Sequence, residues 1–157
     1  MKPASPQIVD LLNEVLTAEL TAINQYFLHA KMARHWGFER LAKKIRHESI
    51  EEMRHADELT ERILLLEGLP NYQRLNTLAV GENVQEQLQN DLALEYQMIE
   101  RLNKGIAVAN SFNDNATRAL LEKILVSEYD HVDWLETQLE AIGQVGLQNY
   151  LSEQLHE

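Results

Sequence analysis

Apolar residues recur at three- and four-residue steps along four long stretches of the chain, which is the pattern of helices that each bury one face. The four stripes comprise Ile8, Leu12, Val15, Ala22, Ile23, Tyr26 and Ala30; Leu41, Ile45, Leu59, Ile63 and Leu66; Leu88, Leu92, Ile99, Leu102 and Ile106; and Leu121, Ile124, Leu135, Leu139 and Ile142. This pattern predicts helices over about 6–35, 39–66, 83–109 and 115–142.

The breaks between these stretches predict how the helices connect. Gly37 separates the first pair and the turn-forming run SFNDNA separates the second, so each pair should form an antiparallel hairpin. After the run Glu67-Gly68-Leu69-Pro70, the link to about Gly81 is long enough to run the length of a bundle. We therefore predict an all-α, single-domain chain over 1–157: a four-helix bundle with one long crossover and a short fifth helix at about 145–156.

Composition narrows the classes of function. The 157 residues include no cysteine, which excludes a disulfide framework, a thiolate metal site and a cysteine nucleophile. The formal net charge of −11 argues against nucleic acid as a partner. We expect no membrane span, since no segment approaches the roughly 18 apolar residues required, and the absence of a signal pattern makes a cytosolic location the expectation.

Six polar residues interrupt the apolar stripes at positions that the periodicity directs into the core. They are Glu19 in the first stretch, Glu52 and His55 in the second, Glu95 in the third, and Glu128 and His131 in the fourth. A buried carboxylate is costly unless it takes a proton or faces a cation. Four carboxylates on converging helix faces therefore indicate that they share a positively charged partner.

The spacing of these residues predicts a pair of metal ions. Two Glu-x-x-His motifs, at 52–55 and 128–131, each place an oxygen and a nitrogen on one helix face. In each half of the chain, 33 residues separate the single glutamate from the motif, as from Glu19 to Glu52. Two metals bridged by Glu52 and Glu128, each with one histidine and one further glutamate, would satisfy every group, as in di-iron carboxylate bundles. Oxygen and imidazole ligands suit iron or manganese and tolerate zinc.

With these motifs the chain resembles the bacterioferritins, most clearly in the stretches AINQYFLHAKM, HESIEEMRHAD, ILLLEGLPN and DHVDWLETQL. The resemblance implies a ferritin-like homo-oligomeric shell of 24 subunits that stores ferric mineral. It implies two iron ions per subunit at the six ligands, where Fe(II) is oxidised by oxygen or peroxide. It also implies a b-type haem shared between two subunits and ligated by one methionine from each, here Met53, and a ferredoxin-like reductant as a partner for iron release.

Some residues and functions stay open at this stage. Tyr26, seven residues after Glu19 on the same helix face, either assists a ligand or satisfies its hydroxyl in the core. His47 and Glu51 form either an inner-surface iron site or a solvated pair. The alternatives to storage are a peroxidase- or catalase-type di-metal enzyme on the same bundle, and a non-catalytic haem subunit in a mixed shell.

Overall fold

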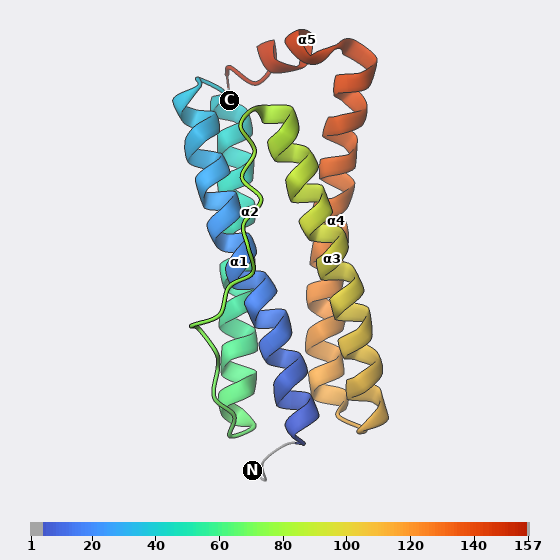
Figure 1. Ribbon diagram of the computed structural model, residues 1–157. Helices are drawn as coiled ribbons and strands as arrows, with labels where there is room; N and C mark the ends of the chain where they lie inside the picture. Colours follow the sequence, from blue (N-terminus) through green and yellow to red (C-terminus); the bar gives the residue numbers. More distant parts are fainter. Residues whose placement is uncertain (1–4, 157) are drawn as a thin grey trace.

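In the computed structural model, residues 5–156 are described, and the regular elements among them are helices (Figure 1). The helices are α1 (Pro6–His35), α2 (Glu39–Leu65), α3 (Val84–Ser111), α4 (Asn115–Val145) and α5 (Leu147–Ser152). The first four lie side by side as a long bundle, and α5 turns across one end of it. None of the described helices is long and apolar enough to cross a membrane.

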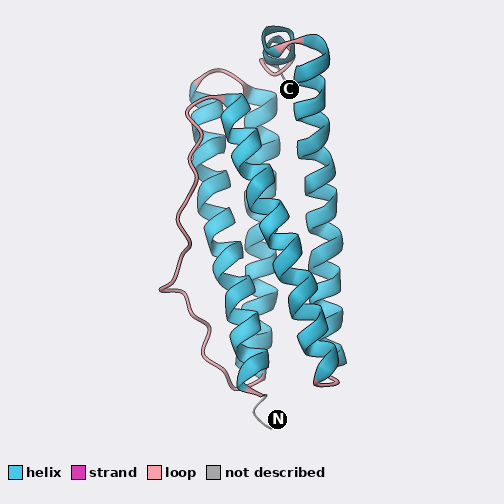
Figure 2. Cartoon of the chain, turned by 45° about the vertical axis from the view of Figure 1, so that its right-hand side comes forward, coloured by secondary structure: helices cyan, strands magenta, loops and turns pink. Residues whose placement is uncertain are grey.

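The connections have the predicted topology. Short turns join α1 to α2 and α3 to α4, while the segment between α2 and α3, here called the crossover (residues 66–83), runs along the outside of the bundle from one end to the other (Figures 1 and 2). The prediction of a four-helix bundle with one long crossover and a short C-terminal helix is confirmed.

Local sequence explains where the helices begin and end. The side chains of Ser5, Asn83 and Asp114 accept hydrogen bonds from backbone N–H groups in the first turns of α1, α3 and α4. Gly37 follows α1 with a φ of 91° and Gly146 follows α4 with a φ of 86°, a conformation that favours glycine. The sequence predicts an end near 142, but α4 continues through Gly143 to Val145, because Gly146 rather than Gly143 leaves the helical conformation. Consequently α5 is shorter than the predicted 145–156.

The core consists of two apolar clusters separated by a polar layer. One cluster contains Leu12, Leu59, Leu102 and Leu121. The other contains Leu41, Leu88 and Leu135. On every long helix, the residues that interrupt the apolar stripe in the sequence lie between the two clusters. On α3, Met98 is buried where the predicted stripe had Ile99, which is only partly buried.

Candidate metal centre

The polar layer brings all six stripe-interrupting residues into one cluster. Each of the four long helices contributes: α1 carries Glu19, α3 carries Glu95, and α2 and α4 each carry one Glu-x-x-His pair. All six residues are buried, and each is at most 6% exposed. The cluster lies midway along the bundle, with an apolar cluster on either side of it.

Two overlapping sets of ligand atoms form within the cluster. In each set, one ligand atom per residue lies within 4.8 Å of all the others; the sets are Glu19, Glu52, His55 and Glu128, and Glu52, Glu95, Glu128 and His131. Glu52 and Glu128 belong to both sets, which is the arrangement expected of carboxylates shared by two ions. The described residues thus offer two adjacent four-residue sites.

Each histidine directs the same ring nitrogen at the carboxylates of its own set. His55 Nδ1 lies 2.9 Å from Glu128 Oε1 and 3.5 Å from Glu19 Oε2. His131 Nδ1 lies 2.9 Å from Glu95 Oε1. The two halves of the centre therefore match in chemistry as well as in sequence spacing.

Several of these atoms have no hydrogen-bond partner although they are fully buried. They are both carboxylate oxygens of Glu19 and of Glu128, one oxygen each of Glu52 and Glu95, and Nδ1 of His55. His55 Nδ1 and Glu128 Oε1 lie 2.9 Å apart, yet both atoms are among these unpartnered ones. Buried polar atoms without partners are rare and costly. Two divalent cations would satisfy them, so the residues fit a metal pair.

Electrostatics also indicate a place for cations. Burial, together with the charges of the neighbouring glutamates, raises the pKa of Glu19, Glu52 and Glu95 well above the ordinary value. Burial, and next the charge of Glu52, raises the pKa of Glu128 to about 8. Without metal the carboxyls therefore tend to keep their protons. Four ionised carboxylates would balance the charge of two divalent ions.

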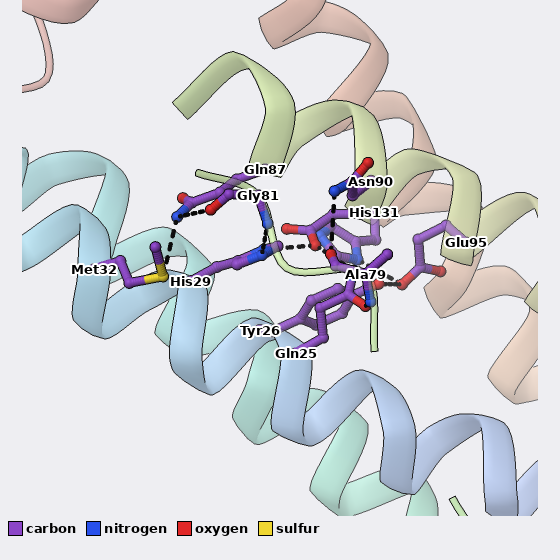
Figure 3. Close-up of polar contacts among 11 residues, drawn as sticks. Gln25, Tyr26, His29, Met32, Ala79, Gly81, Gln87, Asn90, Glu95 and His131 are labelled. Carbon is purple, nitrogen blue, oxygen red and sulfur yellow. Dashed lines mark hydrogen bonds and ion pairs between the residues drawn. The ribbon is translucent and has the colours of Figure 1, made fainter. Parts of the chain in front are cut away.

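Two aromatic side chains, Tyr26 and Trp134, lie next to His131. Figure 3 shows Tyr26 together with Glu95 and His131. The Tyr26 hydroxyl donates a hydrogen bond to Glu95 Oε1, and the Tyr26 ring meets the His131 ring edge-on with centroids 5.2 Å apart. Burial and the charge of Glu95 raise the pKa of Tyr26, so Tyr26 remains a donor. On another side of His131, the Trp134 ring stacks at 6.2 Å.

Sequence reasoning missed Glu48, which also faces the centre. Its Oε2 lies 3.6 Å from His131 Nδ1, and its Oε1 lies 2.7 Å from Lys44 Nζ. The available signal was its position four residues before Glu52 on the same face of α2. Burial alone would lower the pKa of His131, but Glu95, by its hydrogen bond and its charge, and then Glu48 raise it.

The remaining sequence candidates lie outside this cluster. His47 Nε2 is 3.7 Å from Glu51, but both side chains reach solvent and Glu51 is also paired with Arg54. Met53 is 59% exposed, on a pocket of about 490 Å³ between α1 and α2. The structure does not bring either group to the six-residue centre.

Fold and centre together define a class: the ferritin-like bundles whose core carries a cluster of carboxylates and histidines that could hold metal. Residues 9–145 match the ferritin-like domain family. The chain is 54% identical to the bacterioferritin of Mycobacterium leprae and 53% identical to bacterioferritin BfrA of Mycobacterium tuberculosis, in each case over 92% of this chain and 91% of the relative. It is also 53% identical to the bacterioferritin of Streptomyces coelicolor over 94% of this chain and 88% of the relative. The chain belongs to the bacterioferritin family.

Proposed function

We propose that this chain stores iron and is a ferroxidase: it oxidises Fe(II) to Fe(III) with oxygen or peroxide and deposits ferric mineral inside a homo-oligomeric shell. The observation that carries the proposal is the buried cluster of four glutamates and two histidines, whose unpartnered atoms form two adjacent ligand sets. Family membership supports iron as the metal and a shell of many copies as the assembly. The bundle interior of each subunit is then the oxidation site.

The position of each residue in the cluster suggests its role toward the two ions. Glu52 and Glu128 would bridge two Fe(II) ions, with Glu19 and His55 completing one site and Glu95 and His131 the other. Carboxylate oxygen and imidazole nitrogen are ligands that suit iron. Two adjacent Fe(II) ions can each give one electron to the oxidant. Tyr26 keeps its proton and holds Glu95 by a hydrogen bond, which limits the rotation of that carboxylate.

The exposed thioether of Met53 supports a haem site on the α1–α2 face. Its pocket is mainly apolar and is lined by Leu20, Ile23, Ile50, Met53, Arg54, Ala56, Asp57 and Tyr72. An apolar pocket that is open on one side fits a planar cofactor shared with a second subunit. We infer that a b-type haem takes one methionine ligand, Met53, from each of two subunits.

Other exposed apolar side chains support assembly into a shell, here proposed to have 24 copies. Leu69, Val126 and Phe112 lie exposed on different parts of the subunit surface, and large exposed apolar side chains are typical of surfaces that other chains cover. The family resemblance adds a cytosolic location and a ferredoxin-like reductant that releases the iron.

The test is aerobic titration of Fe(II) into metal-free protein, with oxidation followed by absorbance and retained iron counted after gel filtration. We expect a break at about two irons per subunit, set by the two ligand sets, followed by continued uptake into a large particle. The double variant Glu128→Ala with His131→Ala should lose the rapid phase. A matched control, Glu122→Ala with Glu140→Ala, removes two exposed carboxyls of the same helix and should keep it.

The outcomes separate the candidate functions. Uptake that stops at about two irons per subunit would keep the metal pair but favour a non-storage di-metal enzyme over a store. Unchanged oxidation by the Glu128→Ala, His131→Ala variant would refute the assignment of the centre. A rapid phase lost in the control variant as well would show that the effect is not specific to the buried residues.

A further inference from the structure

A row of polar side chains on α1 holds the crossover to the bundle. These side chains lie on one side of the helix, at steps of eight, four and four residues, and each accepts a hydrogen bond from a backbone N–H of the crossover. The four bonds are Asn71 N to Asn13 Oδ1 (2.8 Å), Asn76 N to Thr21 Oγ1 (2.9 Å), Ala79 N to Gln25 Oε1 (3.0 Å) and Gly81 N to His29 Nε2 (2.9 Å). An irregular segment thereby gains the backbone partners that it cannot supply itself.

The last two members of this row meet a carboxylate of α3. Gln25 Nε2 donates to Asp91 Oδ1 at 2.9 Å, and His29 Nδ1 lies 2.9 Å from the same oxygen. Because Gly81 N–H occupies Nε2 of His29, the ring proton is on Nδ1 and is donated to Asp91. All three side chains are buried. This group of Gln25, His29 and Asp91, here called the junction, ties α1, α3 and the crossover together at one point.

The junction adjoins the metal centre along two helices at once. Figure 3 labels its two α1 residues, Gln25 and His29, with Tyr26, Glu95 and His131 of the neighbouring centre. On α1, Gln25 directly precedes Tyr26. On α3, Asp91 lies one turn before Glu95. Since Tyr26 donates its hydroxyl to Glu95, the junction and the Tyr26–Glu95 bond are neighbouring links between the same two helices. A change in the packing of α1 on α3 at the junction would displace Tyr26 relative to Glu95.

We propose that Gln25, His29 and Asp91 are positioning residues of the metal centre. They touch no ligand position themselves; they hold α1 against α3 so that Tyr26 fixes the Glu95 carboxylate facing its ion. This proposal rests on the proposed function, because it assigns a role toward the same centre. Mutation of groups that orient metal ligands from outside the coordination sphere commonly lowers metal affinity by about 10- to 100-fold.

Co(II) is a suitable probe, since its visible absorption reports the geometry of its ligands and the readout requires no turnover. We expect Asp91→Ala to weaken Co(II) binding at the centre about tenfold or more and to change its absorption band. Asp91→Asn keeps an acceptor oxygen for Gln25 and His29 and should bind Co(II) like the unaltered protein. The Glu128→Ala, His131→Ala variant provides the blank for Co(II) bound elsewhere.

The matched control is Asn13→Ala, which removes two hydrogen bonds to the same crossover, to Leu69 O and from Asn71 N, at the end away from the centre. It should lower thermal stability but leave Co(II) affinity and spectrum unchanged. Should Asp91→Ala fail to fold, Gln25→Ala, which removes one donor to Asp91, takes its place with the same expectation. Unchanged Co(II) affinity and spectrum in the Asp91 or Gln25 variant would overturn the positioning role alone. No Co(II) binding by the unaltered protein would overturn the proposed centre and the positioning role with it.

Discussion

Loading the metal-free protein with two divalent ions should release protons, because the four carboxyls of the centre must ionise before they can coordinate. Burial and mutual repulsion raise the pKa of Glu19, Glu52 and Glu95 well above the ordinary value, and that of Glu128 to about 8. Metal binding requires the deprotonated forms, so the protons leave as the ions enter. An exposed acidic cluster, ionised already at neutral pH, would release almost none.

The size of the release follows from these shifts. At pH 7 a group with a pKa of about 8 is roughly 90% protonated, so Glu128 alone supplies about 0.9 proton per subunit. Burial and neighbouring charges raise the pKa values of the other three carboxyls as well, so these groups should add to the release from Glu128. At pH 8 the share of Glu128 falls to about one half, so the release should decrease as pH rises.

The assay is a pH-stat titration of metal-free protein with Co(II), or with Fe(II) under strict exclusion of oxygen, since hydrolysis of a ferric product would release protons of its own. The Glu128→Ala, His131→Ala variant serves as the control and should show little binding and little release. A release well below about 0.9 proton per pair of bound ions at pH 7 would refute the argument, because Glu128 alone accounts for that amount.

Three further predictions concern stability and the haem. The metal-free protein should lose thermal stability as pH rises from about 5 to 8. The reason is that Glu128 has a pKa of about 8 in the folded state and 4.5 in the unfolded state, so the folded state binds more protons over this range. Melting curves recorded at several pH values measure the loss, and Glu128→Gln should make the melting temperature depend less on pH. Gly81→Ala would bring a Cβ within 2.6 Å of the Gln87 Cα and should destabilise the fold by about 2 kcal/mol. Gly143→Ala places its Cβ in open space within α4 and should stabilise the fold by about 1 kcal/mol. Chemical denaturation measures both changes. Met53→Ala should abolish the Soret band of bound haem and leave Fe(II) oxidation unchanged, since Met53 lies outside the centre; a full haem content would contradict the haem assignment.

Much of the fold and of the centre could be predicted from sequence because their signals are periodic and local. Each Glu-x-x-His pair shares a helix face by its i, i+3 spacing alone, and long apolar stripes fix the face that is buried. The errors arise where periodicity is weakest. Ile99 and Met98 are adjacent and both apolar, so only the packing of α3 shows that Met98 is the core residue. Gly143 and Gly146 are both plausible ends of α4, and only the backbone conformation separates them.

The sequence does not reveal the junction, and the reason differs from that for Met98 and Gly146. A polar row at helical spacing, such as Thr21, Gln25 and His29, is the usual sign of a solvent-facing side, yet here all three residues are buried. They are covered by the crossover, whose backbone donors lie more than 50 residues away in sequence and belong to a segment without periodicity of its own. Hydropathy measures the polarity of a helix face but not whether water or another backbone satisfies it. For this part of the protein, the path of the crossover decides the environment of α1, and hydrogen bonds from the crossover backbone hold it against that helix.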